Sequence, residues 1–316
     1  MARTPVSGIQ HTLRSGPYEA VVASVGASLR SLRHDGRDLV VPFGADELRP
    51  GYRGTTLAPW PNRVVDGRHR FGGEELQLAL TEPERGHALH GLSPWLDFHA
   101  VDGGADHVTL AATIEPQTGY PWRVEVTTTF RVGPDGLTQT VVGRNESASA
   151  APWGTGPHPY LVAGDTPLDA WTLELPADDV LLVTEDRLIP THVRPVDADD
   201  PQRFDFRSPR VLGEVEIDHA YTGLRRDAQG LAVVRLTDAA GAGVQMRWDA
   251  ACPWVQIHTA DLPGGPAQPG HRAGLAVEPM TCAPDAFNAE SYDHDAGLIV
   301  LEPGAESSAS WSIAAI

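Results

Sequence analysis

The sequence predicts an all-β fold: one large antiparallel β-sandwich that occupies residues 1–316 as a single domain. Apolar and polar residues alternate with period two along much of the chain, which is typical of strands with one buried face. Glycine and proline are abundant, with 32 and 27 of 316 residues, and both interrupt helices and favour turns. We find no apolar repeat of 3.6 residues at helical length, no internal repeat and no linker that would divide the chain.

The first half of the chain contains the clearest hairpins. Strands are predicted over residues 19–25, 29–33, 38–43, 68–71, 75–78, 107–114, 122–132 and 137–145. Gly72-Gly73 is a two-residue hairpin signal between the fourth and fifth of these strands. The last two strands are rich in β-branched residues and flank a Gly-Pro-Asp-Gly turn at residues 133–136, so a long hairpin is expected there.

The second half of the chain shows shorter segments of the same alternating kind. Strands are predicted over residues 171–175, 231–237, 244–248, 254–258, 298–301 and 306–313. Residues 285–294 could form one short helix at most. The expected architecture is therefore a sandwich built almost entirely from strands.

Charge, cysteine content and hydropathy exclude several classes of partner. The formal net charge of −18 disfavours nucleic-acid binding, which needs a basic face. The start of the chain lacks an apolar signal region, and no stretch of about 18 apolar residues occurs, so no membrane partner is expected. Two cysteines, Cys252 and Cys282, cannot form a disulfide framework for a chain of this length and suit a reducing compartment. A cytoplasmic protein, monomeric or homodimeric, is the expectation.

The common catalytic motifs are absent from the sequence. There is no glycine-rich phosphate loop after a strand, no His-Glu-x-x-His helix, no paired Cys-x-x-Cys and no Gly-x-Ser-x-Gly. The candidate functional residues are instead polar side chains in loops bounded by proline and glycine.

Two such loops lie in the first hundred residues. In the segment 57–63, two prolines flank Trp60 and are followed by Asn62 and Arg63. Arg63 could bind sugar hydroxyls with its rigid set of donors, although an arginine in a surface ion pair fits the same pattern. His87 and His90 have a spacing that two metal ligands could use, but no third ligand is near in sequence, and ordinary hydrogen-bonded histidines are equally consistent.

Three further segments carry candidate acid and base groups. His158 stands between two prolines, which would give a catalytic acid a fixed geometry. Asp218 lies within an alternating segment, and Glu278 ends an apolar strand, where burial would raise the pKa of a carboxyl group towards that of a working base. Taken singly, each of the two carboxylates could equally belong to a structural salt bridge.

Taken together and in this order, the segments resemble the aldose 1-epimerase (galactose mutarotase) family. The similarity covers nearly the whole chain and rests on Ala20-Val21-Val22, Gly26-Ala27-Ser28-Leu29, Asn62-Arg63, Leu89-His90-Gly91, His158-Pro159-Tyr160, Asp218-His219, Glu278-Pro279, Pro284-Asp285-Ala286-Phe287-Asn288 and Leu301-Glu302-Pro303-Gly304-Ala305-Glu306. The best-known galactose mutarotases tend to have Asn-His-x-His-Gly-Gly where this chain has His-Ala-Leu-His-Gly-Leu at residues 87–92. The second histidine of the motif is kept at His90, whereas the neighbouring hydroxyl-binding groups differ.

The resemblance implies a galactose mutarotase fold and an isomerase that interconverts the α and β anomers of a free aldose. It implies no cofactor and no metal. It places the general base at Glu278, the general acid at His158 and a second histidine near the ring oxygen at His90. The residues predicted to bind the monosaccharide are Arg63, Asp218, Asn62 and Tyr160.

Three other functions remain open at this point. A hexose-6-phosphate mutarotase of the same fold would need a basic cluster, for which residues 68–70 and 225–226 are the candidates. A non-catalytic carbohydrate-binding sandwich would not need the pair Glu278 and His158. A glycoside hydrolase would use two carboxylates, such as Asp218 and Glu278, and would leave His158 without a role.

Overall fold

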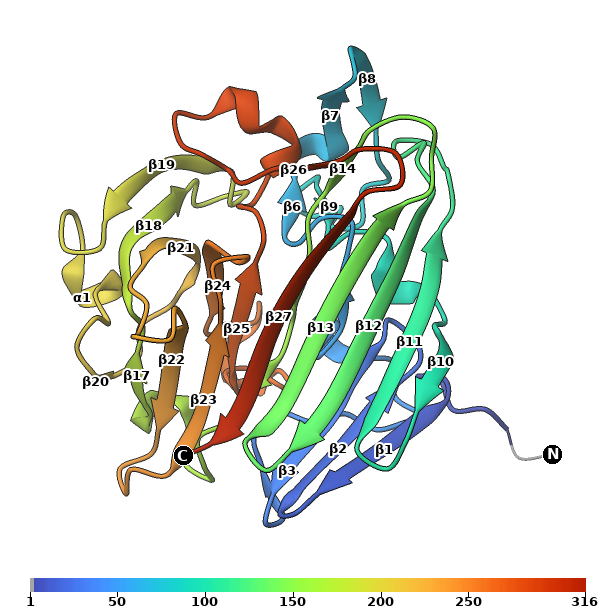
Figure 1. Ribbon diagram of the computed structural model, residues 1–316. Helices are drawn as coiled ribbons and strands as arrows, with labels where there is room; N and C mark the ends of the chain where they lie inside the picture. Colours follow the sequence, from blue (N-terminus) through green and yellow to red (C-terminus); the bar gives the residue numbers. More distant parts are fainter. Residues whose placement is uncertain (1–2) are drawn as a thin grey trace.

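The computed structural model describes residues 3–316 and confirms the predicted antiparallel β-sandwich. Every pairing between its named strands is antiparallel. Two large sheets lie face to face, and a smaller sheet made by the N-terminal strands packs at one end (Figure 1).

The larger sheet has nine strands and crosses the molecule in Figure 1. In spatial order its strands are β10 (His99–Gly103), β11 (His107–Ile114), β12 (Val124–Gly133), β13 (Gly136–Asn145), β27 (Glu306–Ala315), β23 (Gly243–Trp248), β22 (Ala232–Thr237), β17 (Thr172–Glu174) and β20 (Arg210–Val211). The C-terminal strand β27 pairs with β13 on one side and β23 on the other, so the end of the chain joins the two halves of this sheet.

The second sheet has six strands and supports the functional site described below. Its order is β16 (Tyr160–Leu161), β25 (Leu275–Met280), β24 (Trp254–His258), β21 (Asp218–Leu224), β18 (Ala177–Val183) and β19 (Pro190–Pro195). Buried side chains of this sheet, such as Val255 and Val277, belong to the same apolar core as Val234 and Met246 of the nine-stranded sheet. Burial of this shared apolar surface holds the two layers together.

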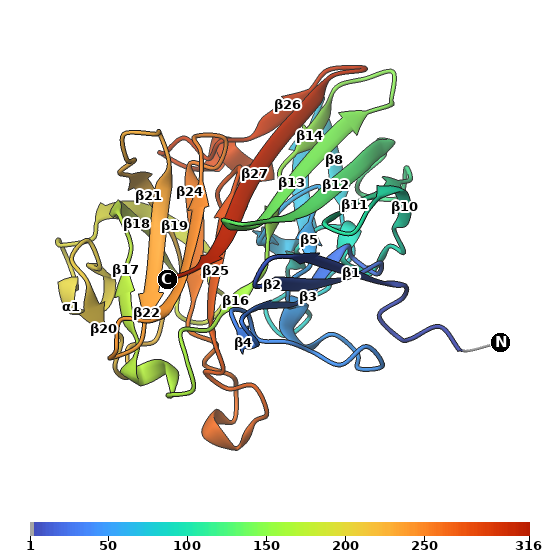
Figure 2. The same cartoon turned by 60° about the horizontal axis from the view of Figure 1, so that its bottom comes forward.

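The N-terminal sheet comes forward in Figure 2, where it lies against β11, β12 and β13. It consists of β1 (Gln10–Ser15), β2 (Tyr18–Ala23), β3 (Ser28–His34) and β4 (Arg37–Asp38). Four short strand pairs complete the fold: β5 (Thr56–Leu57) with β15 (Gly156–Pro157), β6 (Arg63–Val64) with β9 (Ala88–Leu89), β7 (Arg68–Phe71) with β8 (Glu74–Gln77), and β14 (Ala151–Trp153) with β26 (Ile299–Leu301).

The helices are short and lie in the connections. The α-helix α1 (Pro201–Phe204) begins after Asp200, whose side chain accepts a hydrogen bond from the Arg203 N–H. Single 3₁₀ turns cover Pro50–Tyr52, Val65–Gly67, Ser93–Trp95, Leu168–Ala170, Gly265–Ala267 and Ala286–Ser291. The last of these lies within residues 285–294, where the sequence allows one short helix. Within residues 3–316 no helix has the length and apolar character needed to span a membrane.

The two predicted hairpins form as their turn residues require. β12 and β13 stay in register from the pair Val124↔Asn145 to the pair Gly133↔Gly136, and Val124, Val126 and Phe130 point into the core at every second position. Gly72 and Gly73 both have positive φ, as the tight β7–β8 turn demands.

One predicted strand, residues 38–43, is wrong in its extent. The ladder with β3 contains only Arg37–Asp38; the Leu39 N–H still donates to the Leu32 carbonyl, and the chain then crosses to the edge of the six-stranded sheet. There Val40 forms a bridge with Leu161, and the Val41 N–H donates to the Tyr160 carbonyl. Pro42, which has no N–H, follows directly. The chain is extended here, but its partner is a distant strand that local alternation does not identify.

Candidate active site

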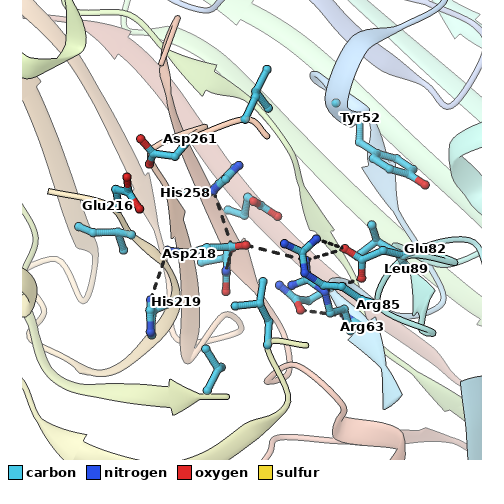
Figure 3. A pocket seen from close by; sticks show the side chains of 18 of the residues that line it. Tyr52, Arg63, Glu82, Arg85, Leu89, Glu216, Asp218, His219, His258 and Asp261 are labelled. Atoms are coloured by element: carbon cyan, nitrogen blue, oxygen red, sulfur yellow. Dashed lines mark hydrogen bonds and ion pairs between the residues drawn. The ribbon is translucent and has the colours of Figure 1, made fainter. Parts of the chain in front are cut away.

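A pocket of about 620 Å³ opens beside strands β21, β24 and β25 of the six-stranded sheet (Figure 3). Its remaining walls come from loops that include Gly51 and Tyr52, Glu82 to Arg85, Val183 to Leu188, and Asp261 to Pro263. The structure brings all seven residues predicted from the sequence to this one pocket: Asn62, Arg63, His90, His158, Tyr160, Asp218 and Glu278.

Asn62 and His90 are held together by two hydrogen bonds between neighbouring loops. The His90 N–H donates to the Asn62 carbonyl over 2.7 Å, and the Asn62 N–H donates to His90 Nδ1 over 3.2 Å. Both residues have positive φ, a strained conformation that is concentrated at functional sites. Gly91 allows this geometry, because a Cβ there would lie 2.1 Å from the Ala58 carbonyl oxygen.

His158 is fixed by its backbone and by its two proline neighbours. Its N–H donates to the Thr55 carbonyl over 3.2 Å, and its own carbonyl accepts from the Gly54 N–H over 2.7 Å. The ring packs at right angles to His90, with 4.9 Å between centroids, and nearly parallel to Tyr160, with 5.1 Å between centroids. The imidazole therefore has little freedom to move within the pocket.

Glu278 lies on β25 opposite Gln256 of β24, and its Oε1 is 3.5 Å from His158 Nε2. Both side chains are almost fully buried. Among residues 3–316, Glu278 Oε2 and His158 Nδ1 have no hydrogen-bond partner. A buried polar atom without a partner is costly, so these atoms are suited to meet a polar ligand.

Burial sets the protonation of this pair. It raises the pKa of Glu278 well above its ordinary value, with a further increase from the nearby Asp218 carboxylate. It lowers the pKa of His158 to about 3, with His258 adding repulsion. These opposite shifts favour a pair that shares one proton, held on the Glu278 carboxyl while the His158 imidazole is neutral.

The hydrogen bond to His90 determines which of its ring nitrogens carries the proton. Burial, together with the neighbouring His158, lowers the pKa of His90 well below its ordinary value, so the ring is neutral. Because Nδ1 accepts from the Asn62 N–H, the proton is on Nε2, which can then donate a hydrogen bond into the pocket.

The same hydrogen bond bears on metal binding. One ligand atom each from His90, His158 and Glu278 lies within 4.8 Å of the others, a spacing from which three residues could hold a metal ion. A metal would need a lone pair on His90 Nε2, whereas the Asn62 N–H stabilises the tautomer that has a proton there. The hydrogen bond from Asn62 therefore favours His90 Nε2 as a hydrogen-bond donor and disfavours it as a metal ligand.

Arg63 is buried and lies between two carboxylates. Its Nε and Nη2 donate to Glu82 over 2.7 and 3.0 Å, and its Nη2 is 3.8 Å from Asp218 Oδ2 (Figure 3). Burial alone would lower the pKa of Arg63, but Asp218 and Glu82 raise it above its ordinary value. The guanidinium is therefore a fixed cation in the wall of the pocket.

Asp218 presents a charged carboxylate to the pocket. Its Oδ1 accepts from Gln256 Nε2 over 2.6 Å and lies 3.9 Å from His258 Nδ1. Burial would raise the pKa of Asp218, but His258, Arg63 and the Gln256 hydrogen bond hold it below its ordinary value. An ionised carboxylate of this kind is a strong acceptor for hydroxyl groups.

The aromatic wall of the pocket is made by tyrosines and not by tryptophans. Trp60, Trp153 and Trp254 are buried in the core, Trp95 is exposed, and none of these four lines the pocket. Tyr52 forms the wall, with its ring 4.7 Å from His90 and 6.4 Å from His158 between centroids. Tyr160 also lines the pocket, but its hydroxyl already donates to the Gly51 carbonyl.

The structure separates His87 from His90. His87 does not line the pocket; its Nδ1 accepts from the Asp66 N–H and its Nε2 bonds to the Arg187 carbonyl. Sequence reasoning missed Tyr52, Glu82, Gln256 and His258. The last two lie on a predicted strand whose alternation could have placed them on one face, whereas Tyr52 and Glu82 carry no recognisable local signal.

Comparison with known proteins identifies the family of the chain. The family model described as aldose 1-epimerase matches residues 10–314. The uncharacterized protein YihR of Escherichia coli (strain K12) is 33% identical over 300 residues, which cover 94% of this chain and 90% of that protein.

Two solved structures share the fold. The GalM/aldose epimerase homologue from Caenorhabditis elegans has a TM-score of 0.81 and 18% identity, with coverage of 98% of this chain and 99% of that one. Galactose 1-epimerase from Lactobacillus acidophilus NCFM has a TM-score of 0.77 and 16% identity, with coverage of 97% and 94%. The family match spans nearly all of the chain, and the protein belongs to the aldose 1-epimerase family.

Proposed function

We propose that this protein is an aldose 1-epimerase that interconverts the α and β anomers of an uncharged free sugar. One observation carries the proposal: a buried carboxyl group and a buried imidazole lie 3.5 Å apart in the wall of a pocket that is lined with hydroxyl-binding groups. Anomer exchange needs a base at the C1 hydroxyl and an acid at the ring oxygen, and both oxygens are attached to the same carbon. Two groups this close can reach both oxygens at once.

In the proposed mechanism, Glu278 is the base and His158 the acid. The single proton of the pair must first reside on His158. Glu278 then removes the proton from the C1 hydroxyl while His158 protonates the ring oxygen, and the C1–O5 bond breaks to give the open aldehyde. Rotation about C1–C2 presents the other face of the aldehyde, and the two residues reverse their roles as the ring closes. No electrons are gained or lost, and every proton returns to its starting group.

The other polar groups would bind and orient the sugar. His90 is suited to donate from Nε2 towards the ring oxygen, and Arg63 and Asp218 to bind hydroxyls as donor and acceptor. Asn62 and Tyr160 line the same pocket, and we assign them to the same sugar site. The Tyr52 ring would form an apolar wall for the C–H face of the sugar.

The charge of the pocket argues for an uncharged substrate over a sugar phosphate. Its lining residues include three arginines and seven acidic residues, namely Glu82, Glu84, Glu185, Glu216, Asp218, Asp261 and Glu278. Each of these arginines already donates to a protein oxygen: Arg63 and Arg85 to Glu82, and Arg203 to the Glu216 carbonyl. The basic segments at residues 68–70 and 225–226 lie outside the pocket. A phosphate would thus enter a negative field in which every arginine of the pocket is already paired with a protein oxygen.

Polarimetry tests the proposal directly. Freshly dissolved pure anomers of a panel of aldoses, and the corresponding 6-phosphates, are followed with and without the protein. We expect faster approach to the equilibrium rotation for at least one uncharged aldose and little effect on the phosphates. Rates equal to spontaneous mutarotation for every sugar would refute the proposal, and selective action on the phosphates would replace it with the phosphorylated substrate class.

We also propose that the protein acts in the cytoplasm, as a monomer or homodimer, on a small sugar alone. Both of its cysteines, Cys252 and Cys282, are buried and unpaired, which suits a reducing compartment.

A further inference from the structure

Glu82 is a buried carboxylate at the pocket whose partners are both arginines. Its side chain is only 5% exposed, and it accepts from Arg63 Nε at 2.7 Å, Arg63 Nη2 at 3.0 Å and Arg85 Nη1 at 2.9 Å. Removal from water would raise the pKa of Glu82, but the hydrogen bonds and charge of Arg63 hold it below its ordinary value. Glu82 is therefore ionised at neutral pH.

The backbone around Glu82 is as firmly held as its side chain. Its carbonyl accepts from the N–H groups of Arg85, Gly86 and His87, and its own N–H donates to the His87 carbonyl. This tight turn of residues 82–87 places the carboxylate on the side of Arg63 away from Asp218 (Figure 3). A planar guanidinium bound through two of its N–H groups cannot rotate, so its orientation is set by the carboxylate.

Without Glu82, the acidic groups that act on Arg63 are the Asp218 carboxylate and the Glu278 carboxyl group. Asp218 already lies 3.8 Å from Arg63 Nη2, and the Arg63 charge already acts on Glu278. A buried cation moves towards the nearest anion, because an unpaired charge is unstable in a low-dielectric site. Arg63 would then compete with the sugar for Asp218 and stabilise the ionised form of Glu278.

We propose that Glu82 is a positioning residue, which holds Arg63 back from Glu278 and keeps the free edge of the guanidinium directed at the sugar hydroxyls. This inference rests on the proposed anomerase function. It assigns Glu82 no contact with the sugar and no part in proton transfer.

The test is Glu82→Gln, which preserves the shape but removes the charge and places an amide N–H against the guanidinium N–H groups. We expect KM for the preferred aldose to rise at least about tenfold, the effect of losing a hydrogen bond to a charged group. We also expect a change in the alkaline limb of the pH profile of kcat/KM, where activity falls as pH rises. This limb should move to lower pH, because Arg63 would lie closer to Glu278 and stabilise its ionised form. Glu74→Gln is the matched control: this glutamate is exposed on β8, outside the pocket, and both KM and the pH profile should be unchanged.

Circular dichroism and thermal unfolding show whether the variant folds. Should Glu82→Gln fail to fold, Glu82→Asp keeps the charge but is too short to bind both N–H groups from the same backbone position. It should fold, raise KM to a smaller extent, and return the alkaline limb towards that of the wild type.

Two outcomes separate this inference from the proposed function. Wild-type protein that fails to accelerate mutarotation of any sugar would refute the function, and this inference with it. An active wild type, with a folded Glu82 variant that keeps both the wild-type KM and the wild-type alkaline limb, would refute the role of Glu82 alone.

Discussion

At the scale of single residues, the proposed chemistry depends on the burial of Glu278 beside His158. A carboxyl group whose pKa is raised in the folded state binds protons more tightly there than in the unfolded chain. Between its ordinary pKa of about 4.5 and the raised value, the free energy of unfolding therefore decreases as pH rises. The residue proposed as the base thus lowers the stability of the protein at neutral pH.

Glu278→Gln separates these two effects. Gln keeps the shape but cannot accept a proton, so we expect anomerase activity to be lost while the fold remains. At neutral pH the variant should unfold at a higher temperature than the wild type, and the difference should shrink as pH is lowered towards 4.5. Polarimetry and calorimetry over that pH range provide the measurements. A folded variant with near-normal activity would remove Glu278 from the role of base.

The histidines provide a graded comparison. His158→Ala should lower kcat by at least about 10²-fold, the usual cost of losing an acid catalyst, and His90→Ala should also be severe. His99, exposed on β10, is the control, and its alanine variant should be silent. His69 is a poorer control because its buried ring bonds to the Gly119 carbonyl and contributes to the fold. Equal losses at His99 and His158 would contradict these assignments.

The pH dependence of kcat/KM should reflect the pair and not a single histidine. With the pKa of His158 lowered to about 3 and that of Glu278 raised, the pair keeps one shared proton between these limits. Activity should stay level as pH falls through 6.5, the ordinary pKa of histidine, and should decline at high pH once the shared proton is lost. Initial rates of a single anomer, measured across pH, test this. An acid limb centred near 6.5 would be inconsistent with a neutral His158.

At the scale of elements, the loop after β25 clamps the strand that carries Arg63. Asp285 donates its N–H to the Arg63 carbonyl and accepts the Val65 N–H on Oδ1, both over 2.8 Å. Its carboxylate also accepts from Asn288 Nδ2 and from the Tyr292 hydroxyl. The motif at residues 284–288 thus connects to the site through the backbone of β6.

Asp285→Ala should therefore both destabilise the protein and weaken sugar binding. Several hydrogen bonds to a buried carboxylate are lost, and we expect the free energy of unfolding to fall by about 2–4 kcal/mol. KM should rise more than kcat falls, because Arg63 is displaced while Glu278 and His158 stay in place. Asp293→Ala, in the same loop but 78% exposed, should change neither quantity. Unaltered stability in the Asp285 variant would show that the clamp contributes little.

At the scale of the whole molecule, the site forms where loops from both halves of the chain meet the six-stranded sheet. The proposed reaction needs only proton transfer and the breaking of one C–O bond. We therefore expect activity to survive exhaustive chelation and dialysis without added nucleotide. Metal analysis of the active protein and assays before and after chelation give the answer. A stoichiometric metal whose removal abolishes activity and whose return restores it would overturn the acid–base scheme.

Several features of this protein follow from the sequence alone. Most strands form close to where alternation and turn residues predict them, and strands 68–71, 107–114 and 254–258 match at both ends. The hairpins formed because turn chemistry is local: Gly72-Gly73 and the turn at 133–136 act on adjacent residues. The ordered motifs also sufficed to nominate seven residues that the fold gathers into one pocket.

Other features were decided only by the tertiary structure. Nothing local indicates that β27 inserts between β13 and β23, or that residues 39–41 run along β16, because strand pairing links segments that are far apart in sequence. The 3.5 Å between His158 and Glu278 and the hold of Glu82 on Arg63 depend on the same long-range packing. A sequence pattern specifies which face of a strand is buried, whereas the partner of that strand, and the charge placed beside each buried group, are set by the contacts of the complete fold.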